Sequence, residues 1–272
     1  MKNSMGLFVK VLGILCAFYS ISFAEVFETQ KMKDIENFID PETLVLVDID
    51  NTLMAPTGNT GSDPWFYFQW EALTQANPGA GQDNFIKALQ IWTQAQDRIK
   101  MQPVEALTPG LIQKIRASGN TVIALTSRSP RIKDRTLLQL QSVGIELSPK
   151  LAGLDSSEAV SLPVGTHPEL VEESLFMKGI VFVGNNDKGQ VLRKLFGLAN
   201  YKPQAVIYVD DKKPHVESVE KICEGFGIKY SGFRYGAADA KVNTYKARIA
   251  ALLTWGISLF DALRIMEYAD LF

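Results

Sequence analysis

The most informative stretch of the chain is LVLVDIDNT, residues 44–52. It opens with four apolar residues that do not alternate with polar ones, a pattern typical of a strand covered on both faces. Two aspartates, Asp48 and Asp50, follow this run directly. Because parallel α/β sheets bind their ligands at the carboxyl ends of the strands, the stretch predicts a buried strand with a functional position at its end.

Three further apolar runs have the same character, at 121–125, 180–183 and 205–209. Helical periodicity lies between and beyond them, at 109–117, 131–143, 189–198 and after Pro214. Strands that alternate with helices predict a Rossmann-like parallel α/β sheet with helices on both faces. Polar residues again follow each run: Thr126 and Ser127, then Asn185 to Lys188, then Asp210 and Asp211.

Residues 54–107 interrupt this alternation, because they contain no convincing strand. A loop at 58–62, which reads as flexible, precedes five aromatic residues between 65 and 70, and a longer helical pattern covers 85–99. We expect a small helical cap, inserted after the first strand of a core formed by 25–53 and 108–240. Five aromatics in six positions cannot all face inward on one helix, so some are expected to face the site and the rest to form the cap's own core. The apolar pattern of 241–272 predicts a C-terminal helical segment packed on the core.

The first 24 residues have the composition of a secretory signal peptide. Lys2 and Lys10 precede a short apolar run, and Ser22 and Ala24 are the small residues expected before a cleavage site. The run is shorter than the ~20 residues that span a bilayer, so no stable membrane anchor is expected after cleavage. The sequence therefore predicts an exported protein, periplasmic or secreted.

The composition of the 272 residues excludes several classes of protein. With 46% hydrophobic and 21% charged residues, the chain does not belong to the disordered class. The net charge is −2 and no basic run is present, so no nucleic-acid partner is expected. After the signal peptide, the cysteines and histidines are Cys223, His167 and His215, too few for a structural zinc site.

The polar groups at the strand ends resemble, in this order, the four motifs of the haloacid dehalogenase (HAD) superfamily. The matching residues are Asp48 with Asp50, then Thr126, Lys188, and Asp210 with Asp211. The stretch 184–189 is also similar to an uncharacterised group of secreted bacterial HAD-like proteins. The resemblance implies a Rossmann-like sheet, Mg²⁺, and phosphoryl transfer through an aspartyl-phosphate.

This resemblance implies a role for each motif residue, and the chemistry agrees with it. Asp48 would be the nucleophile, and Asp50 would protonate the leaving alcohol and then activate water. The Asp48 carboxylate, the Asp50 backbone carbonyl and the Asp210 carboxylate would bind Mg²⁺ through hard oxygen ligands. Thr126 and Lys188 would bind the phosphoryl group. Thr52, Ser127 and Asp211 would support these groups, Asp211 as a possible metal ligand in place of Asp210.

Several residues also have simpler interpretations. Thr52 can support its loop through hydrogen bonds, and Ser127 and Arg128 can either assist Thr126 or belong to a solvated turn. Asp187 can cap a helix, and His215 reads as a surface residue of a helix. Cys223 falls on an apolar helical stripe and is expected in the core.

The function that these observations favour is that of an exported, Mg²⁺-dependent phosphatase acting on a small-molecule phosphate monoester. The presence of Asp50 favours a phosphatase over a dehalogenase, since HAD dehalogenases lack this second aspartate. Two alternatives remain open: a phosphotransferase that uses the same site, and a non-catalytic binding or host-interaction protein that retains the scaffold.

Overall fold

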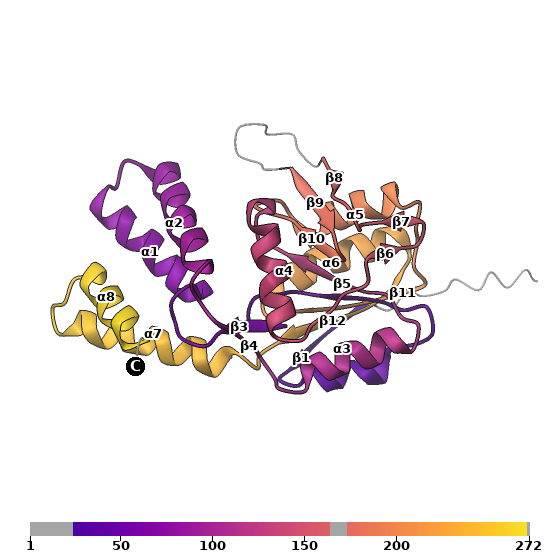
Figure 1. The fold of residues 1–272 in the computed structure, drawn as a ribbon, viewed down its shortest axis with the longest axis horizontal. Helices are drawn as coiled ribbons and strands as arrows, with labels where there is room; N and C mark the ends of the chain where they lie inside the picture. Colours follow the sequence, from indigo (N-terminus) through magenta and orange to yellow (C-terminus); the bar gives the residue numbers. More distant parts are fainter. Residues whose placement is uncertain (1–23, 164–172, 271–272) are drawn as a thin grey trace, which may run out of the picture.

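A mostly parallel eight-stranded sheet forms the centre of the computed structural model, which describes residues 24–163 and 173–270 (Figure 1). In spatial order its strands are β1 (Ala24–Thr29), β12 (Lys229–Tyr235), β11 (Ala205–Asp210), β2 (Leu44–Val47), β5 (Val122–Thr126), β10 (Ile180–Phe182), β9 (Ser174–Met177) and β8 (Val160–Leu162). The strands from β1 to β10 in this order pair in parallel, whereas β9 and β8 join antiparallel at one edge. The predicted α/β class is confirmed. The predicted signal peptide, apart from Ala24, and His167 lie outside the described residues.

Helices cover both faces of the sheet, as the uninterrupted apolar strands require. On one face Val45 and Val47 pack with the 3₁₀ helix η1 (Met32–Phe38), α3 (Thr108–Ala117) and α4 (Lys133–Ser142). On the other face Leu44 and Leu46 pack with α5 (Lys188–Leu198) and α6 (Lys213–Phe226). Cys223 of α6 is fully buried there, so its predicted place in the core is confirmed.

The order of the strands brings the predicted motifs together. From β2 the chain passes to β5 and β10 on one side, then crosses to β11 on the other side of β2 and continues to β12. Val47 of β2 lies beside Val209 of β11, so both strands end at the same level of the sheet. This reversal of direction creates a crevice outside the carboxyl ends of β2 and β11, where Asp48 and Asp210 lie.

The structure adds strands that the sequence patterns did not predict. β1 precedes β2, so the cap follows the second strand of the chain and not the first. Within the inserted region, β3 (Met54–Pro56) and β4 (Met101–Pro103) form a small antiparallel sheet, although no strand was expected there. Strands of three residues are too short to show a period of two. The short β6 (Lys150–Leu151) and β7 (Leu154–Asp155) form another two-stranded sheet.

Two helices, α1 (Asp63–Ala76) and α2 (Gly81–Gln96), form the cap above β3 and β4. Ser62 accepts a hydrogen bond from the backbone N–H of Trp65 and so caps the start of α1, with Pro64 in its first turn. In Figure 1 this helical pair lies to one side of the sheet.

The C-terminal helices pack against the cap rather than on the sheet, which corrects the expectation for 241–272. α7 (Asp239–Thr254) and α8 (Leu259–Ala269) contact α1, and Figure 1 shows them beside the cap. Their buried side chains form one cluster with Trp65 and Trp92 of the cap. An apolar stripe predicts that a helix packs, but it does not identify the surface that receives it. Every helix among the described residues is too short or too polar to cross a membrane.

The loop at 58–62, which reads as flexible in the sequence, is held by hydrogen bonds to the residue that follows α8. Asp270, just beyond α8, accepts hydrogen bonds from the backbone N–H groups of Asn59 and Thr60, both at 2.7 Å. A side chain at Gly58 would collide with the same carboxylate. The path of the chain into the cap is therefore fixed by the C-terminal helices.

We predict that Gly189→Ala destabilises the protein by about 1–3 kcal/mol, the usual cost of overpacking. A Cβ at Gly189 would lie 2.4 Å from the Ser218 carbonyl oxygen and force α5 away from α6. Gly197→Ala is the matched control on the same helix, because a Cβ there meets nothing within 4 Å. Chemical denaturation should show the loss for Gly189→Ala alone; equal stability of the two variants would show that this close approach is not needed.

Candidate active site

An ammonium group between two carboxylates forms the centre of the site. Lys188 Nζ lies 2.6 Å from Asp48 Oδ1 and 2.7 Å from Asp210 Oδ2, and all three residues are buried. Asp48 follows β2, Asp210 ends β11, and Lys188 is the first residue of α5. The Asp187 side chain accepts a hydrogen bond from the Gln190 backbone N–H, so the helix-cap interpretation of Asp187 is confirmed.

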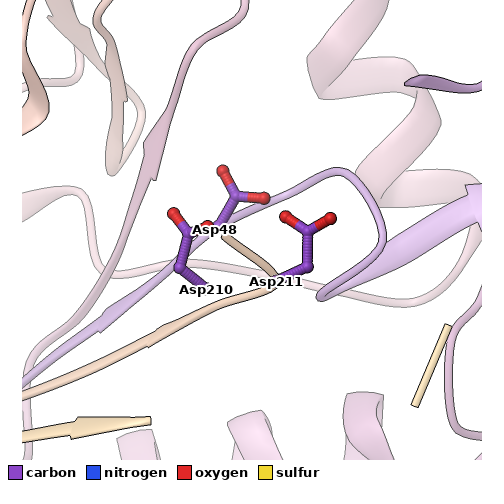
Figure 2. Close-up of side chains that lie close together, drawn as sticks. All are labelled: Asp48, Asp210 and Asp211. Atoms are coloured by element: carbon purple, nitrogen blue, oxygen red, sulfur yellow. The ribbon is translucent and has the colours of Figure 1, made fainter. Parts of the chain in front are cut away.

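A third carboxylate completes an acidic cluster. Asp48, Asp210 and Asp211 each bring an oxygen within 4.8 Å of the others (Figure 2). Burial raises the pKa of Asp48 to about 6, although the Lys188 ammonium opposes this. Burial also raises the pKa of Asp211 to about 9, with the carboxylates of Asp63 and Asp48 adding to it. The cluster thus holds more negative charge than Lys188 balances.

This donor set fits a hard divalent cation, which binds carboxylate oxygens. The sequence predicted the Asp48 carboxylate, the Asp50 backbone carbonyl and the Asp210 carboxylate as ligands, with Asp211 in support. The structure gathers the side chains of Asp48, Asp210 and Asp211, so Asp211 is available as a third carboxylate ligand. Its Oδ2 also accepts a hydrogen bond from Asn51 Nδ2 at 3.2 Å.

The Asp210 carboxylate has several polar partners besides Lys188. The Tyr208 hydroxyl and the Lys212 backbone N–H donate to it, the latter at 2.7 Å. His215 Nδ1 lies 3.2 Å from Asp210 Oδ2. Burial acts to raise the pKa of Asp210, but Lys188 and His215 outweigh it and hold that pKa below its usual range.

The interpretation of His215 as a surface residue is therefore wrong. Its ring lines the cavity above the cluster and contacts Asp210. The signal in the sequence was its spacing, because a residue in the first turn of the helix after Asp210 can reach back to the strand end.

The Asp50 carboxylate is directed to an arginine. Arg128 Nε and Nη2 donate to its two oxygens, each at 2.8 Å, in a bidentate pair. Arg128 is only 3% exposed, so its interpretation as part of a solvated turn is wrong. Ser127, its neighbour in the loop, is exposed and lines the cavity.

The two predicted threonines occupy different positions. Thr126, at the end of β5, lines the cavity, and its Oγ1 accepts the Arg128 backbone N–H at 3.2 Å, which leaves the hydroxyl proton to donate. Thr52 is fully buried, and its Oγ1 has no hydrogen-bond partner among the described residues. The expected support of the loop by the Thr52 side chain is not observed; its backbone N–H instead donates to the Ile49 carbonyl.

A cavity of about 350 Å³ lies over these groups. Its floor contains Asp48, Asp50, Thr126 and Asp211, and the cap supplies an aromatic wall of Phe66, Tyr67, Trp70 and Phe85. Trp65 is buried in the cluster beneath the cap, so the five aromatics of α1 divide between core and cavity, as expected. Lys212 of the core pairs with Asp63 of the cap at the rim.

Comparisons with solved structures give HAD-like proteins. The structure is similar to a haloacid dehalogenase-like family hydrolase from Streptococcus pneumoniae, with a TM-score of 0.41 and 11% identity over 70% of this chain and 93% of the other. A HAD family enzyme from Bacteroides thetaiotaomicron gives a TM-score of 0.36 and 9% identity, at 70% and 93% coverage. Both TM-scores are below 0.5, so these two likenesses add nothing to what the strand order and the grouped side chains show.

Comparisons of sequence give bacterial relatives along most of the chain. A Chlamydia pneumoniae protein named "Putative outer membrane protein" is 26% identical, over 90% of this chain and 88% of its own length. A Rickettsia prowazekii protein named as uncharacterized is 24% identical, over 83% of each chain. The model of the family described as "Protein of unknown function (DUF2608)" matches residues 28–257. Because this match spans most of the chain, the protein belongs to the DUF2608 family.

Proposed function

We propose that the protein is an exported, Mg²⁺-dependent phosphatase that hydrolyses phosphate monoesters through an aspartyl-phosphate. The observation that carries the proposal is the position of Asp48 at the floor of the capped cavity, beside Lys188 and two further carboxylates. Export is supported by the predicted signal peptide 1–24 and by the name of the chlamydial relative.

Asp48 is the proposed nucleophile. Lys188 holds its Oδ1, which orients the carboxylate and leaves Oδ2 for attack on phosphorus. A bond forms between this oxygen and phosphorus while the bond from phosphorus to the ester oxygen breaks. The Thr126 hydroxyl and the Lys188 ammonium stabilise the charge on the phosphoryl oxygens. Mg²⁺ held by Asp48, Asp210 and Asp211 would supply further Lewis-acid stabilisation of this charge.

Asp50 is the proposed acid and base. It lines the cavity two residues from the nucleophile, so in its protonated form it can give a proton to the departing ester oxygen. In the second half of the reaction it takes a proton from the water that attacks phosphorus and releases inorganic phosphate. Asp48 is thereby regenerated as a carboxylate.

Asp48→Asn should reduce hydrolysis of a chromogenic aryl phosphate by roughly a thousandfold or more, because an amide is a poor nucleophile and metal ligand. Initial rates with saturating Mg²⁺ provide the measurement. Asp187→Asn is the matched control, since asparagine also caps helices and this residue lies outside the reacting groups. Undiminished turnover by a folded Asp48→Asn protein would exclude Asp48 as the nucleophile.

Mg²⁺ should bind more tightly as the pH rises from 7 to 9. The pKa of Asp211 is about 9 in the metal-free protein, so this carboxyl holds a proton at pH 7 that the cation must displace. Raising the pH removes that proton in advance and strengthens apparent binding. Calorimetry in two buffers of different ionisation enthalpy measures the released protons, and Asp211→Asn should abolish the release between pH 7 and 9. A wild-type protein that releases no proton at pH 7 would show that Mg²⁺ displaces no proton from Asp211.

Trp70→Ala should lower kcat/KM for a bulky aryl phosphate roughly ten- to two-hundredfold and leave a minimal phosphate monoester such as methyl phosphate little changed. Trp70 lines the cavity and meets Phe85 edge-on at 5.2 Å, so it offers an apolar surface to an organic leaving group. Phe68→Ala is the control on the same helix, because Phe68 packs against Tyr245 of α7. Equal losses on both substrates would assign Trp70 a purely structural role.

A further inference from the structure

A continuous series of hydrogen bonds, buried beyond its start at Asp50, leads from Asp50 to the cap. It begins at Arg128, whose Nε and Nη2 donate to the two Asp50 oxygens. The remaining terminal nitrogen, Nη1, donates to Thr136 Oγ1 at 3.1 Å and to Gln139 Oε1 at 2.6 Å. Thr136 and Gln139 belong to α4, and both are buried. The guanidinium plane, and with it the Asp50 carboxylate, is therefore oriented by α4.

Gln139 continues the series from the core into the cap. Its Nε2 donates to the backbone carbonyl of Gln96 at 3.1 Å and to the Gln96 Oε1 at 3.2 Å. Gln96 is the last residue of α2 and is fully buried. Each amide hydrogen of Gln139 thus has an acceptor that only the cap provides.

The series ends at the loop that leads into the cap. Gln96 Nε2 and Trp92 Nε1 both donate to the Gly61 carbonyl, at 3.0 and 2.9 Å. Gly61 precedes α1, whereas Gln96 ends α2, so both ends of the cap meet at this point. Trp92 also lies over the Arg128 guanidinium, 5.6 Å from ring centroid to Cζ.

Displacing the cap would leave buried polar groups without partners. Gln139 would lose both acceptors, and an unsatisfied buried amide costs about 1–3 kcal/mol. The side chain would then rearrange and change the acceptor that it offers to Arg128. Since fully bonded buried networks favour one arrangement, the docked position of the cap and the orientation of Arg128 are linked.

We propose that Arg128 is a positioning residue that links the docked position of the cap to the orientation of Asp50 through Gln139 and Gln96. This inference rests on the proposed function, in which Asp50 transfers the protons. The link through Arg128 makes proton transfer by Asp50 efficient only while the cap closes the cavity and excludes water from the site.

The test compares Gln96→Ala with Gln94→Ala, an exposed glutamine on the same helix. With an aryl phosphate, Gln96→Ala should lower kcat about ten- to a hundredfold, the range expected for a misplaced catalytic group, and change KM and the Mg²⁺ requirement less than twofold. Gln94→Ala should match the wild type. Arg128→Lys keeps the charge but not the bidentate fork, so it should lower kcat to a similar extent. In the Arg128→Lys background, Gln96→Ala should have little further effect on kcat.

Hydrogen exchange gives a readout that does not depend on turnover. Gln96→Ala should accelerate exchange in residues 126–129, beyond its own helix, and Gln94→Ala should not. Unchanged exchange there, an unchanged kcat in Gln96→Ala, or equal effects of Gln96→Ala in the wild-type and Arg128→Lys backgrounds would each overturn the link. If Gln96→Ala accelerates this exchange but the wild-type protein hydrolyses no phosphate ester, the result would support the link and overturn the proposed function instead.

Discussion

The ion pairs of Lys188 with Asp48 and Asp210 join the two strands and the helix that form the site. Two carboxylates enclosed side by side cost several kcal/mol unless a cation shares their site, and Lys188 lies within 2.7 Å of both. The ammonium reaches them because α5 starts at the end of the sheet and packs tightly on α6, where Gly189 donates its backbone N–H to Ser218 Oγ. β2 and β11 must also be neighbours, since they carry the two aspartates. The ion pairs therefore depend on both the strand order and the close packing of α5 on α6 at Gly189.

A second set of charges connects this centre to the cap. Arg128 occupies both oxygens of Asp50, and Lys212 at the rim pairs with Asp63 of α1. The C-terminal helices hold the cap from the opposite side, through the apolar cluster around Trp65 and through Asp270. The cap is therefore held at several points, which is consistent with a cavity whose aromatic wall has a defined position relative to Asp48.

Much of the core could be predicted from the sequence because its strands are uninterrupted apolar runs, and parallel strands place their carboxyl ends together. That rule alone brings Asp48, Thr126 and Asp210 to one edge, and Lys188 follows from the helix that starts there. This rule does not assign Arg128, because its partner Asp50 is distant in sequence. It does not assign His215 either, because the contact with Asp210 depends on which way the first turn of α6 faces. β1 has six residues, but they mix apolar and polar side chains and form no apolar run. The three-residue β3 and β4 are too short to show a period. The surface on which the C-terminal helices pack is defined only by the three-dimensional structure.

The proposed mechanism requires that Asp48 becomes phosphorylated during turnover. The most direct measurement is acid quenching during the reaction of the protein with an aryl phosphate and Mg²⁺, followed by borohydride reduction and peptide mass spectrometry. An acyl phosphate on Asp48 is reduced to homoserine, so homoserine should appear at position 48 only when substrate and Mg²⁺ are both present. Steady hydrolysis with position 48 unmodified, or with the modification at Asp50, would contradict it.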